Sequence, residues 1–478
     1  MSTAMTLSER SSSSRAQRTL ARYFGPSRLK VDAADCEPYR RDASELEGEL
    51  PAAIVLAESS ADVELALRAA AEAGVPIVPR GGGTGKTGGA VPVSGGIVLD
   101  LRGLSRIVEI DRREQLAVVE PGVVLSDFRA AVRAEGLFYA PDPSSRVACT
   151  LGGNVATNAG GPRALKYGVT GRHVLGLEAL LLGGQRISVG RRTSKGVTGY
   201  DLTSLLVGSE GTLAVFGRIT LRLLPPPEST RTLLVPFPRM AQAAEAVGDI
   251  IEQGLGPSCL ELLDARASGG RAALLPELVG PELGAAVAGT EALLLIEVDG
   301  SERECEASAD RIRGACRARG ARDDRVASVA LHRERLWDVR SNMSASLRRT
   351  ARHKLSEDIA VPRSQLGRLL DQLEQLSQRH DVRSVAYGHA GDGNLHVNFL
   401  WDEAEEAPRV QAAIRALFEL TVALGGTLSG EHGIGVLKAP YLPLEQSAEL
   451  IALQRSLKQT FDPAGLLNPG KIFPPSSG

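Results

Sequence analysis

The sequence has few aromatic residues and no excess of charge of either sign. Aromatic residues make up 4% of the 478-residue chain, so its cores must rest on Leu, Val, Ile and Ala. The 55 Lys and Arg residues balance 57 Asp and Glu residues, which argues against a nucleic-acid-binding protein because such proteins carry a basic excess that neutralises phosphates. Charged residues at 23% and near balance are typical of a globular chain rather than a disordered one.

Paired cysteines and long apolar runs are also absent. None of the five cysteines forms a C-x-x-C pair, which argues against a disulfide framework, a zinc ribbon or an iron–sulfur cluster. Scattered cysteines indicate a reducing compartment, so we expect a cytoplasmic protein. The longest apolar stretches, such as residues 175–182, are too short to span a bilayer, and we expect no transmembrane segment. The Ser- and Arg-rich N-terminus faintly resembles a transit peptide, but its composition favours a disordered tail.

The length suggests about three domains or two large ones. Residues 1–44 are polar with little periodicity and are expected to be a tail and lead-in, with folding starting near Pro51. Residues 45–226 alternate strand-like and helical segments and are rich in glycine, and a proline cluster ends them. A second α+β domain is expected at 227–425, followed by a C-terminal segment at 426–478.

The strand and helix expectations rest on hydrophobic periodicity. AAIVLAESSADVELALRAAAEAGVPIVPR predicts a strand–helix–strand unit with a helix start at Ser59 to Asp62. Further strands are expected in GGIVLDL, RIVEID, LAVVEPG, TRTLLVPFP, SCLELLD and ALLLIEVDG. Helices are expected in VLSDFRAAVRAEG, in RSQLGRLLDQLEQLSQRH and from Glu445 to Lys458, and the following FDPAGLLNPGKIF is expected to be irregular.

A glycine-rich loop, RGGGTGKTGGAVP, follows the second strand of that unit. Glycines after a strand let backbone N–H groups approach a phosphate closely. The GKT tripeptide matches the end of a Walker A loop, but Arg80 stands where that motif needs its first glycine. The spacing GTGKTG fits the Rossmann pattern, but GGAVPVSGG cannot open the helix that a Rossmann site needs. A loop that wraps a pyrophosphate and a flexible surface loop both remain open for this stretch alone.

Two more clusters of small and polar residues favour a ligand. PDPSS and TLGGNVATNAGG combine glycines with side-chain amides and hydroxyls, and GSEGTL follows after YDL. Such stretches let a large flat ligand lie against the backbone. In this order the three clusters resemble those of flavoproteins of the vanillyl-alcohol oxidase type, and within them the group of the glycolate oxidase flavoprotein, D-lactate dehydrogenase and D-2-hydroxyglutarate dehydrogenase. The resemblance covers about residues 45–473.

The resemblance implies a fold and a cofactor. The fold is α+β, with a PCMH-type FAD-binding domain of two α+β subdomains, then a FAD-linked oxidase C-terminal α+β domain for the substrate, and a last segment that returns to the FAD site. Some members attach the flavin through a His or Cys of the first loop, and residues 80–89 contain neither, so we expect non-covalent FAD. The strand at 217–220 is also expected to contribute backbone contacts. The residues implied to hold FAD are Arg80, Gly81, Gly82, Gly83, Thr84, Gly85, Gly88, Pro141, Asp142, Thr150, Gly152, Gly153, Asn154, Thr157, Asn158, Gly160, Gly161, Tyr167, Gly168, Glu210, Gly211, Ile219 and Asn468.

Three of the seven histidines lie in two short C-terminal segments, GHAGDGNLHVN and GEHGIG. Asp392-Gly393 predicts a two-residue hairpin turn, which would place His389 directly opposite His396. Two imidazoles and Glu431 would make an open three-ligand site that suits zinc, manganese or iron. Two cross-strand histidines satisfied by backbone groups are the alternative. By the resemblance, the two histidines and Glu431 hold a divalent metal, zinc before manganese or iron.

The resemblance also assigns the chemistry of a 2-hydroxy acid. His432 is the base that takes the hydroxyl proton as the α-hydrogen leaves as hydride for flavin N5, and an imidazole suits this role near neutral pH. Arg340 and Lys354 hold the substrate carboxylate, and the chain has only eight lysines. Ser344 and Asn398 are further polar contacts. Cations on a solvated helix surface are the competing interpretation, which applies to Arg348, Arg349 and Arg352 more than to Arg340.

The sequence therefore predicts an FAD- and metal-dependent dehydrogenase of a D-2-hydroxy acid such as D-lactate, glycolate or D-2-hydroxyglutarate. One alternative is an electron-delivering flavoprotein subunit in a complex with iron–sulfur partners, since the chain lacks cluster cysteines. Another is a metal-independent oxidase or alkyl-transfer enzyme on the same scaffold. The electron acceptor (quinone, electron-transfer flavoprotein, cytochrome or oxygen), the oligomeric state (including a homodimer) and peripheral attachment at the inner membrane are open.

Overall fold

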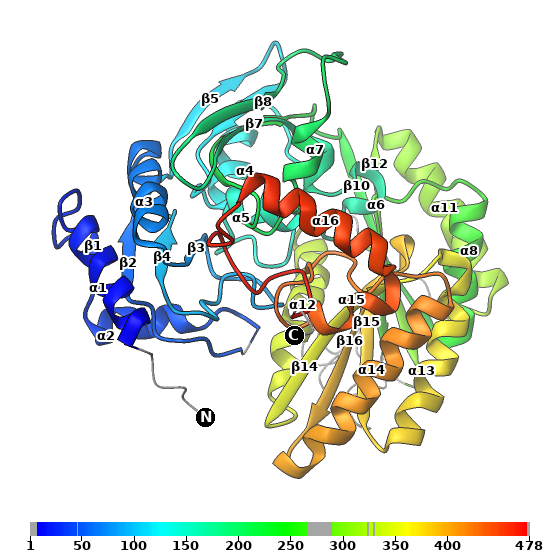
Figure 1. Cartoon of the computed structure of the whole chain (residues 1–478). Coiled ribbons are helices and arrows are strands. Elements are labelled where there is room, and N and C mark those ends of the chain that lie inside the picture. Colours follow the sequence, from blue (N-terminus) through cyan, green and yellow to red (C-terminus); the bar gives the residue numbers. More distant parts are fainter. Residues whose placement is uncertain (1–6, 45, 265–288, 323–324, 328–329, 476–478) are drawn as a thin grey trace. The chain divides into compact units, whose positions relative to one another are not determined.

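The computed structural model describes residues 7–44, 46–264, 289–322, 325–327 and 330–475 (Figure 1). The chain divides into two compact units. The first unit comprises Met1–Ala159, Val169–Pro225 and Glu431–Gly478, and the second comprises Gly160–Gly168 and Pro226–Gly430. The chain thus enters the second unit twice and ends in the first.

The first unit begins with a small sheet of four strands in the order β1-β2-β4-β3. Strands β2, β4 and β3 are parallel, and β1 is antiparallel to β2. The predicted strand–helix–strand unit is confirmed, with Ser59 accepting a hydrogen bond from the Asp62 amide at the start of α3. The elements are α1 (Leu7–Leu20), β1 (Leu29–Lys30), α2 (Ala33–Cys36), η1 (Glu37–Arg40), β2 (Ala53–Leu56), α3 (Ser60–Ala73), β3 (Ile77–Arg80) and β4 (Ile97–Asp100).

The expectation that folding starts near Pro51 is wrong. Helix α1 precedes that residue, and Ala16, Leu20 and Phe24 are buried in the same hydrophobic core as α3. The helix has so few apolar side chains that no period of 3.6 residues is visible in its sequence. Its contribution to the core depends on packing against α3, which a sequence pattern does not reveal.

A second sheet of the first unit has five antiparallel strands in the order β5-β6-β9-β7-β8. The helix expected between Glu445 and Lys458 is found slightly later, because Ser447 caps α16 by accepting a hydrogen bond from the Leu450 amide. The elements are β5 (Ile107–Asp111), β6 (Leu116–Val119), α4 (Leu125–Ala134), α5 (Leu151–Thr157), η2 (Thr170–His173), β7 (Val174–Leu180), β8 (Arg186–Gly190), α7 (Leu202–Leu206), β9 (Val215–Arg222), η7 (Ala439–Tyr441), α15 (Leu442–Glu445) and α16 (Ala448–Phe461).

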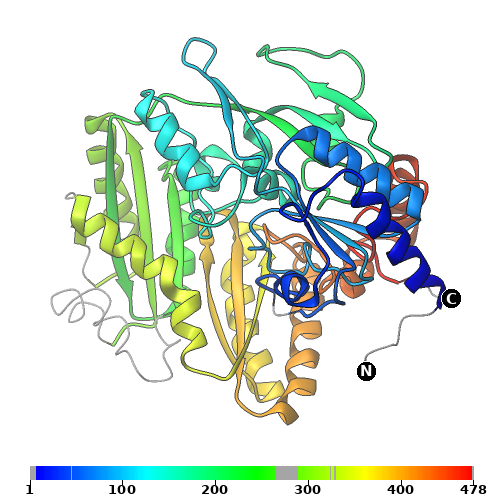
Figure 2. The ribbon, with the colours of Figure 1, turned by 90° about the vertical axis from the view of Figure 1, so that its left-hand side faces the viewer.

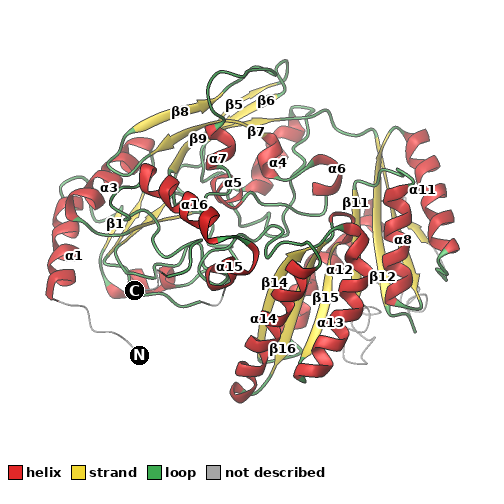
Figure 3. Ribbon diagram, turned by 45° about the vertical axis from the view of Figure 1, so that its right-hand side comes forward, coloured by secondary structure: helices red, strands yellow, loops and turns green. Residues whose placement is uncertain are grey.

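The second unit is built on one antiparallel sheet of seven strands in the order β13-β10-β12-β11-β15-β16-β14 (Figure 3). The three strands expected in its first half are confirmed as β10, β11 and β12, and the mixed helix and strand content confirms the α+β class. The elements are α6 (Ala164–Tyr167), β10 (Ser229–Phe237), α8 (Met240–Glu252), β11 (Cys259–Asp264), β12 (Ala292–Gly300), α11 (Glu302–Ala318), β13 (Arg325–Ala327), α12 (Ala330–Arg348), β14 (His353–Ala360), η4 (Arg363–Gln365), α13 (Leu366–His380), β15 (Arg383–His389), η5 (Ala390–Asp392), β16 (Asn394–Trp401), η6 (Ala404–Glu406) and α14 (Ala407–Ala423).

Helix α12 covers one face of this sheet, and Figure 2 shows it in yellow-green across the strands. Its side chains Leu336, Met343 and Leu347 share a hydrophobic core with Leu295 of β12 and Val385 of β15. The predicted amphipathic helix of RSQLGRLLDQLEQLSQRH is confirmed as α13, which packs with α8 and α14. The face under α12 is the one on which His389 and His396, the two histidines predicted as metal ligands, lie.

The predicted register of the β15–β16 hairpin is wrong. His389 pairs with Asn394, and His396 pairs with Tyr387. The turn is a short 3-10 helix at Ala390–Asp392 that ends at Gly393 with φ 74°, so four residues and not two connect the strands. The two histidines are therefore diagonal neighbours on the same face rather than direct cross-strand partners.

Candidate active site

The glycine-rich loop leaves the end of β3 without a helix, as the sequence predicts. A Cβ atom added at Gly81 would overlap Thr150 Oγ1, and one at Gly82 would overlap the carbonyl oxygen of Ala148. Only glycine fits at these two positions, because the backbone of the loop lies directly against the second predicted cluster. The two segments therefore present a surface made largely of backbone, which suits a pyrophosphate.

Arg80, at the start of this loop, is folded back over its own unit. Its guanidinium carbon lies 5.4 Å from the centre of the Tyr39 ring, and its Nη1 donates to the carbonyl oxygen of Ala90 at 3.4 Å. Burial lowers the pKa of Arg80, with Asp42 and Asp100 opposing the effect. The arginine thus adds positive charge beside the glycine loop.

The TLGGNVATNAGG cluster contains a short helix, α5, which sequence reasoning did not foresee. Thr150 caps it by accepting a hydrogen bond from the Gly153 amide at 3.3 Å. Asn158 ends it with φ 51°, and its Oδ1 accepts from the Gly171 amide at 2.8 Å. These two polar side chains are therefore used, at least in part, to shape the backbone.

Glu210 of GSEGTL is buried and holds another loop of its unit. Its two carboxylate oxygens accept hydrogen bonds from the amides of Ile434 and Gly435, each at 2.8 Å. Burial raises the pKa of Glu210, while the two amide donors and nearby lysines oppose this shift. The residue has φ 52°, an unfavourable conformation for a non-glycine residue, which the surrounding contacts must hold in place. Glu210 was predicted to contact FAD, and the structure adds a contact to the GEHGIG loop.

The C-terminal segment of the chain packs onto the same loops. Asn468 Nδ2 donates to the carbonyl oxygens of Glu210 at 2.7 Å and Gly89 at 3.0 Å. Lys471, 3% exposed, donates to the carbonyl oxygen of Val91 at 2.8 Å. The sequence predicted Asn468 in this region and overlooked Lys471.

Most of the residues predicted to hold FAD lie in the first unit, on the loops just described. Ile219 lies in β9 and is fully buried in a hydrophobic core, so only its backbone is available for a ligand. The stretch Gly160–Gly168, which contains four of the predicted residues, belongs to the second unit. There Tyr167 donates to the Asp299 carboxylate at 2.8 Å, and burial, followed by this contact, raises the pKa of the tyrosine.

The first unit also offers polar atoms that suit a bound flavin nucleotide. Ser209 Oγ and Asn468 Oδ1 are buried and have no hydrogen-bond partner among the residues that the structure describes. Buried polar atoms normally have a partner, so such atoms are candidates for contact with a polar ligand. Together with the glycine backbone at Gly81 and Gly82, they fit FAD in chemical character.

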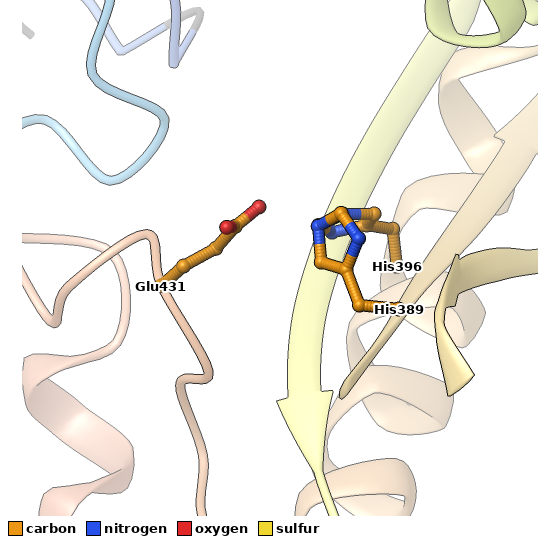
Figure 4. A group of neighbouring side chains, drawn as sticks. All are labelled: His389, His396 and Glu431. Carbon is orange, nitrogen blue, oxygen red and sulfur yellow. The ribbon is translucent and has the colours of Figure 1, made fainter. Parts of the chain in front are cut away.

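The structure brings the three predicted metal ligands together. One ligand atom from each of His389, His396 and Glu431 lies within 4.8 Å of the others, and Figure 4 shows the carboxylate pointing toward the two imidazoles. Both histidines are buried, and their ring centres are 5.3 Å apart. Two imidazoles and a carboxylate are a donor set that zinc, manganese and iron accept.

A carboxylate that sequence reasoning missed contacts one of these histidines. Glu261 of β11 is fully buried, and its Oε1 lies 2.5 Å from His389 Nδ1. Its Oε2 accepts from Arg340 Nε at 2.5 Å. Although burial raises the pKa of Glu261, the contacts with His389 and Arg340 outweigh this effect and lower it to about 2. The only signal in the sequence was one glutamate inside the apolar strand SCLELLD.

The predicted substrate cations lie on the face that α12 shares with the histidines. Arg340 is 6% exposed, and its guanidinium carbon lies 4.9 Å from the centre of the Tyr387 ring. Lys354 of β14 is 5% exposed and donates to Ser344 Oγ at 2.7 Å. Tyr387 was also missed; its ring lies 5.5 Å from that of His396.

Asn398, the fourth predicted substrate contact, is fully buried in β16. Its Nδ2 donates to the carbonyl oxygens of His396 at 3.1 Å and Val385 at 3.3 Å. The amide therefore supports the strand that carries His396. By contrast, Arg348, Arg349 and Arg352 are exposed, as expected of surface cations.

His432, the predicted base, lies next to Glu431 in an irregular loop of the first unit. Its carbonyl oxygen accepts a hydrogen bond from Thr87 Oγ1 at 3.2 Å. The carbonyl oxygen of Thr87 in turn accepts from the amide of Val436 at 2.8 Å. Thr87 thus holds the backbone of His432 and Val436, and Glu210 holds the amides of Ile434 and Gly435 between them.

Comparison with known proteins supports the interpretation of both units. Residues 51–190 match the FAD binding domain, and residues 226–472 match the C-terminal domain of FAD linked oxidases. The chain is 38% identical over 459 residues to the glycolate oxidase subunit GlcD of Bacillus subtilis, covering 95% of this chain and 96% of that one. It is 37% identical over 419 residues to the D-lactate dehydrogenase of Archaeoglobus fulgidus, covering 88% and 90%. It is 34% identical over 454 residues to the D-2-hydroxyglutarate dehydrogenase of Xanthomonas citri, covering 93% and 94%.

Solved structures with the same fold are more distant in sequence. A 4-ethylphenol oxidase from Gulosibacter chungangensis matches with a TM-score of 0.79 at 19% identity, covering 97% of this chain and 98% of that one. A p-cresol methylhydroxylase matches with a TM-score of 0.78 at 16% identity, covering 96% of each chain. These matches confirm the expected PCMH-type fold. None of the helices in the described residues has both the length and the hydrophobicity that crossing a membrane requires.

The first two glycine clusters thus lie within the matched FAD binding domain, and the sheet face that carries His389 and His396 lies within the matched C-terminal domain of FAD linked oxidases. The relatives named above align with this chain over almost their full length. The chain therefore belongs to the FAD-linked oxidase family, in the group of the glycolate oxidase flavoprotein, D-lactate dehydrogenase and D-2-hydroxyglutarate dehydrogenase, and is an FAD-dependent oxidoreductase.

Proposed function

We propose that the protein oxidises a D-2-hydroxy acid, of the lactate, glycolate or 2-hydroxyglutarate class, to the 2-oxo acid and uses a divalent metal beside FAD. The observation that carries this proposal is the group of His389, His396 and Glu431, whose ligand atoms lie within 4.8 Å of one another. The names of the relatives, which act on 2-hydroxy acids, support the substrate class.

The donor set fits a catalytic metal site. Two imidazoles and one carboxylate leave coordination positions for substrate oxygens, as in open zinc sites. A metal bound there would act as a Lewis acid on the substrate hydroxyl and would lower its pKa. Zinc is our first expectation, and manganese and iron(II) share the same ligand preferences.

Two cations are available for the substrate carboxylate. Arg340 and Lys354 are both buried on the sheet face that also carries His389 and His396. Arginine suits a carboxylate because its planar guanidinium can donate two parallel hydrogen bonds. We assign these two side chains to the carboxylate and Ser344 to a supporting contact with Lys354.

We assign the removal of the hydroxyl proton to the imidazole of His432. The reference pKa of a histidine imidazole is about 6.5, so this type of side chain can accept a proton near neutral pH. Thr87 and Glu210 hold the backbone on either side of this residue, which limits where its ring can lie. Bound FAD supplies the acceptor for the α-hydrogen.

The flavin is proposed to be held without a covalent bond. Residues 80–89 contain no His or Cys that could attach it. The backbone of Gly81 and Gly82 and the polar atoms of Ser209 and Asn468 are the proposed contacts. Acid precipitation should therefore release all of the FAD into the supernatant, whereas a yellow pellet would contradict this assignment.

A second candidate role concerns the path of the electrons after the flavin. The relative from Bacillus subtilis is named as a subunit of glycolate oxidase, and this chain has no C-x-x-C pair for a cluster of its own. We therefore propose as the alternative that it is the FAD subunit of an electron-transfer complex with iron–sulfur partners.

The five free and buried cysteines support a reducing location, which we propose to be the cytoplasm or the inner surface of the membrane. Co-purification of cluster-containing subunits, and loss of turnover with a quinone acceptor without them, would support the alternative.

A substrate panel tests the main proposal. The purified protein is mixed without oxygen with the D- and L-forms of lactate, 2-hydroxyglutarate and malate, and with glycolate, while flavin absorbance is followed. We expect rapid bleaching with one of the D-acids or glycolate and with none of the L-acids. A flavin that none of these acids reduces would refute the assigned substrate class and leave the FAD fold standing.

A further inference from the structure

Glu261 is a buried carboxylate that contacts a proposed metal ligand with one oxygen and a proposed substrate cation with the other. We propose that it is a positioning residue, which fixes the tautomer and direction of His389 and the place of Arg340 at the same time. This inference rests on the proposed function, because it assigns Glu261 a role toward the metal and the substrate carboxylate.

The strand around Glu261 shows why a carboxylate is unexpected there. Leu260, Leu262 and Leu263 surround it in β11, and all of these residues are buried. A buried carboxylate without hydrogen bonds or a charge partner would cost several kcal/mol. Glu261 has both kinds of partner, because β11 pairs with β15 so that Leu263 lies opposite Tyr387 and Glu261 faces His389.

The contact with His389 determines which ring nitrogen is available to a metal. Glu261 Oε1 lies 2.5 Å from Nδ1. The carboxylate can only accept at this distance, so Nδ1 carries the proton. Nε2 then keeps its lone pair and is the metal ligand. A carboxylate behind a ligating imidazole also raises the basicity of the imidazole and restricts its rotation.

The contact with Arg340 extends the same carboxylate toward the substrate. Arg340 Nε donates to Oε2 at 2.5 Å, while its guanidinium lies over the Tyr387 ring. These two contacts fix the plane of the guanidinium. One side chain therefore fixes the positions of both the proposed metal ligand His389 and the proposed carboxylate-binding cation Arg340. This would keep the two groups that bind the hydroxyl and the carboxylate of a 2-hydroxy acid at a constant distance from each other.

The same sheet face offers a matched control. Glu297 of β12 is 1% exposed and, like Glu261, accepts from an arginine, Arg163, at 2.9 Å, and from Trp337 Nε1 at 3.0 Å. Neither of these two bonds involves a proposed metal ligand. Glu297→Gln thus removes a buried carboxylate charge from the same sheet face and leaves His389 and Arg340 with their partner.

The experiment compares E261Q and E297Q with the parent as FAD-loaded proteins. Zinc and manganese affinities are measured by competition with a chelator, and FAD content is measured by absorbance. KM and kcat are determined with the acid that reduces the flavin of the parent. We expect E261Q to bind zinc about 10- to 100-fold more weakly and to show a raised KM, with unchanged FAD content. E297Q should bind zinc as the parent does.

A second measurement does not depend on the folding of E261Q. The chain has seven histidines, so selective ¹⁵N labelling gives a simple spectrum, and the signal of His389 is assigned with H389Q. In the zinc-loaded protein we expect His389 to be protonated on Nδ1 and ligated through Nε2. This outcome would support the inference even if E261Q failed to fold.

The outcomes separate the two proposals. A parent that binds no divalent metal, or that is reduced equally fast without one, refutes the proposed metal function and this inference with it. A parent with a working metal site, together with an E261Q variant of parental zinc affinity and KM, refutes only the role of Glu261. Ligation of the metal by His389 through Nδ1 would also refute the role of Glu261 alone.

Discussion

Single side chains of the proposed site are held by contacts that fix their direction before any ligand arrives. Glu261 accepts from both His389 and Arg340, and Lys354 donates to Ser344. The two cations were visible in the sequence through the resemblance, because each lies in a recognisable segment. Glu261 and Tyr387 were not, since an isolated residue within an apolar strand carries no spacing pattern.

The role of His432 is tested by H432N. Loss of a general base lowers kcat by about 10²- to 10⁴-fold, and we expect this loss with unchanged FAD content and zinc affinity. Stopped-flow flavin reduction measures it. His380 lies at the end of α13, outside both predicted site segments, and H380N serves as the control that should keep the parental rate. An H432N variant within about threefold of the parental rate would contradict the assignment, since a base contributes at least tens-fold.

Arg340 is tested by replacement with lysine. A lysine cannot both donate to Glu261 from the Nε position and keep a planar group over Tyr387. Its contact with the substrate carboxylate should therefore be weaker than that of the arginine. A hydrogen bond to a charged group contributes about 1.5–3 kcal/mol, and we therefore expect KM for the acid to rise roughly 10- to 100-fold. The exposed Arg348 provides the control R348K, for which KM should not change. An unchanged KM in R340K would show that this side chain does not bind the substrate.

At the level of secondary-structure elements, much of the fold could be predicted from the sequence. Strands β10, β11 and β12 appeared where short apolar runs placed them, because they are buried along most or all of their length, and α13 appeared where its helical period placed one apolar face. The turn of the β15–β16 hairpin did not, since Asp392-Gly393 ends a 3-10 turn instead of forming a two-residue loop. That difference moved His389 from the position opposite His396 to a diagonal one, while both stayed on one face.

The loop that carries Glu431 and His432 depends on an element distant in sequence. Glu210→Gln replaces one acceptor oxygen with a donor that would face the amide of Ile434 or Gly435. An unmatched buried polar pair costs about 1–3 kcal/mol, so we expect a lower Tm together with weaker zinc binding. Thermal unfolding and chelator competition measure the two effects. The exposed Glu405→Gln is the control, and parental values of both quantities in E210Q would contradict the described role.

The C-terminal segment should make stability depend on alkaline pH. Burial lowers the pKa of Lys471 to about 8, against the opposing effects of Asp42 and Glu210. Because the unfolded lysine keeps its usual pKa near 10.4, the unfolded state binds more protons between these values, and stability rises as pH increases from about 8 to about 10. The gain is lost as pH falls through the folded-state pKa.

This dependence is measured as the free energy of unfolding at saturating FAD across that pH range, in the parent and in Lys471→Met. Methionine keeps the unbranched shape without the charge, so the rise should be smaller in K471M by up to about 3 kcal/mol. Lys195→Met, at an exposed position, should leave the rise unchanged. Equal slopes in the parent and in K471M would contradict the burial argument.

For the whole molecule, the path of the chain between the two units is a feature of the fold that no single motif reveals. The chain passes into the second unit at Gly160–Gly168, returns, and passes into it again at Pro226 before its last segment rejoins the first unit. No periodicity in the sequence predicts that path, because it depends on which segments share a core. Packing of α1 on α3 was missed for the same reason.

The central claim, a D-2-hydroxy-acid dehydrogenase that needs a metal at His389, His396 and Glu431, is tested most directly by one measurement. The rate of anaerobic flavin reduction by the preferred D-acid is recorded in the parent before chelation, after chelation, and after zinc or manganese is added back. We expect the rate to fall at least about 10²-fold on chelation and to return with the metal, with FAD retained throughout. A rate that exhaustive chelation leaves unchanged would contradict it and would favour a metal-independent reaction on the same fold.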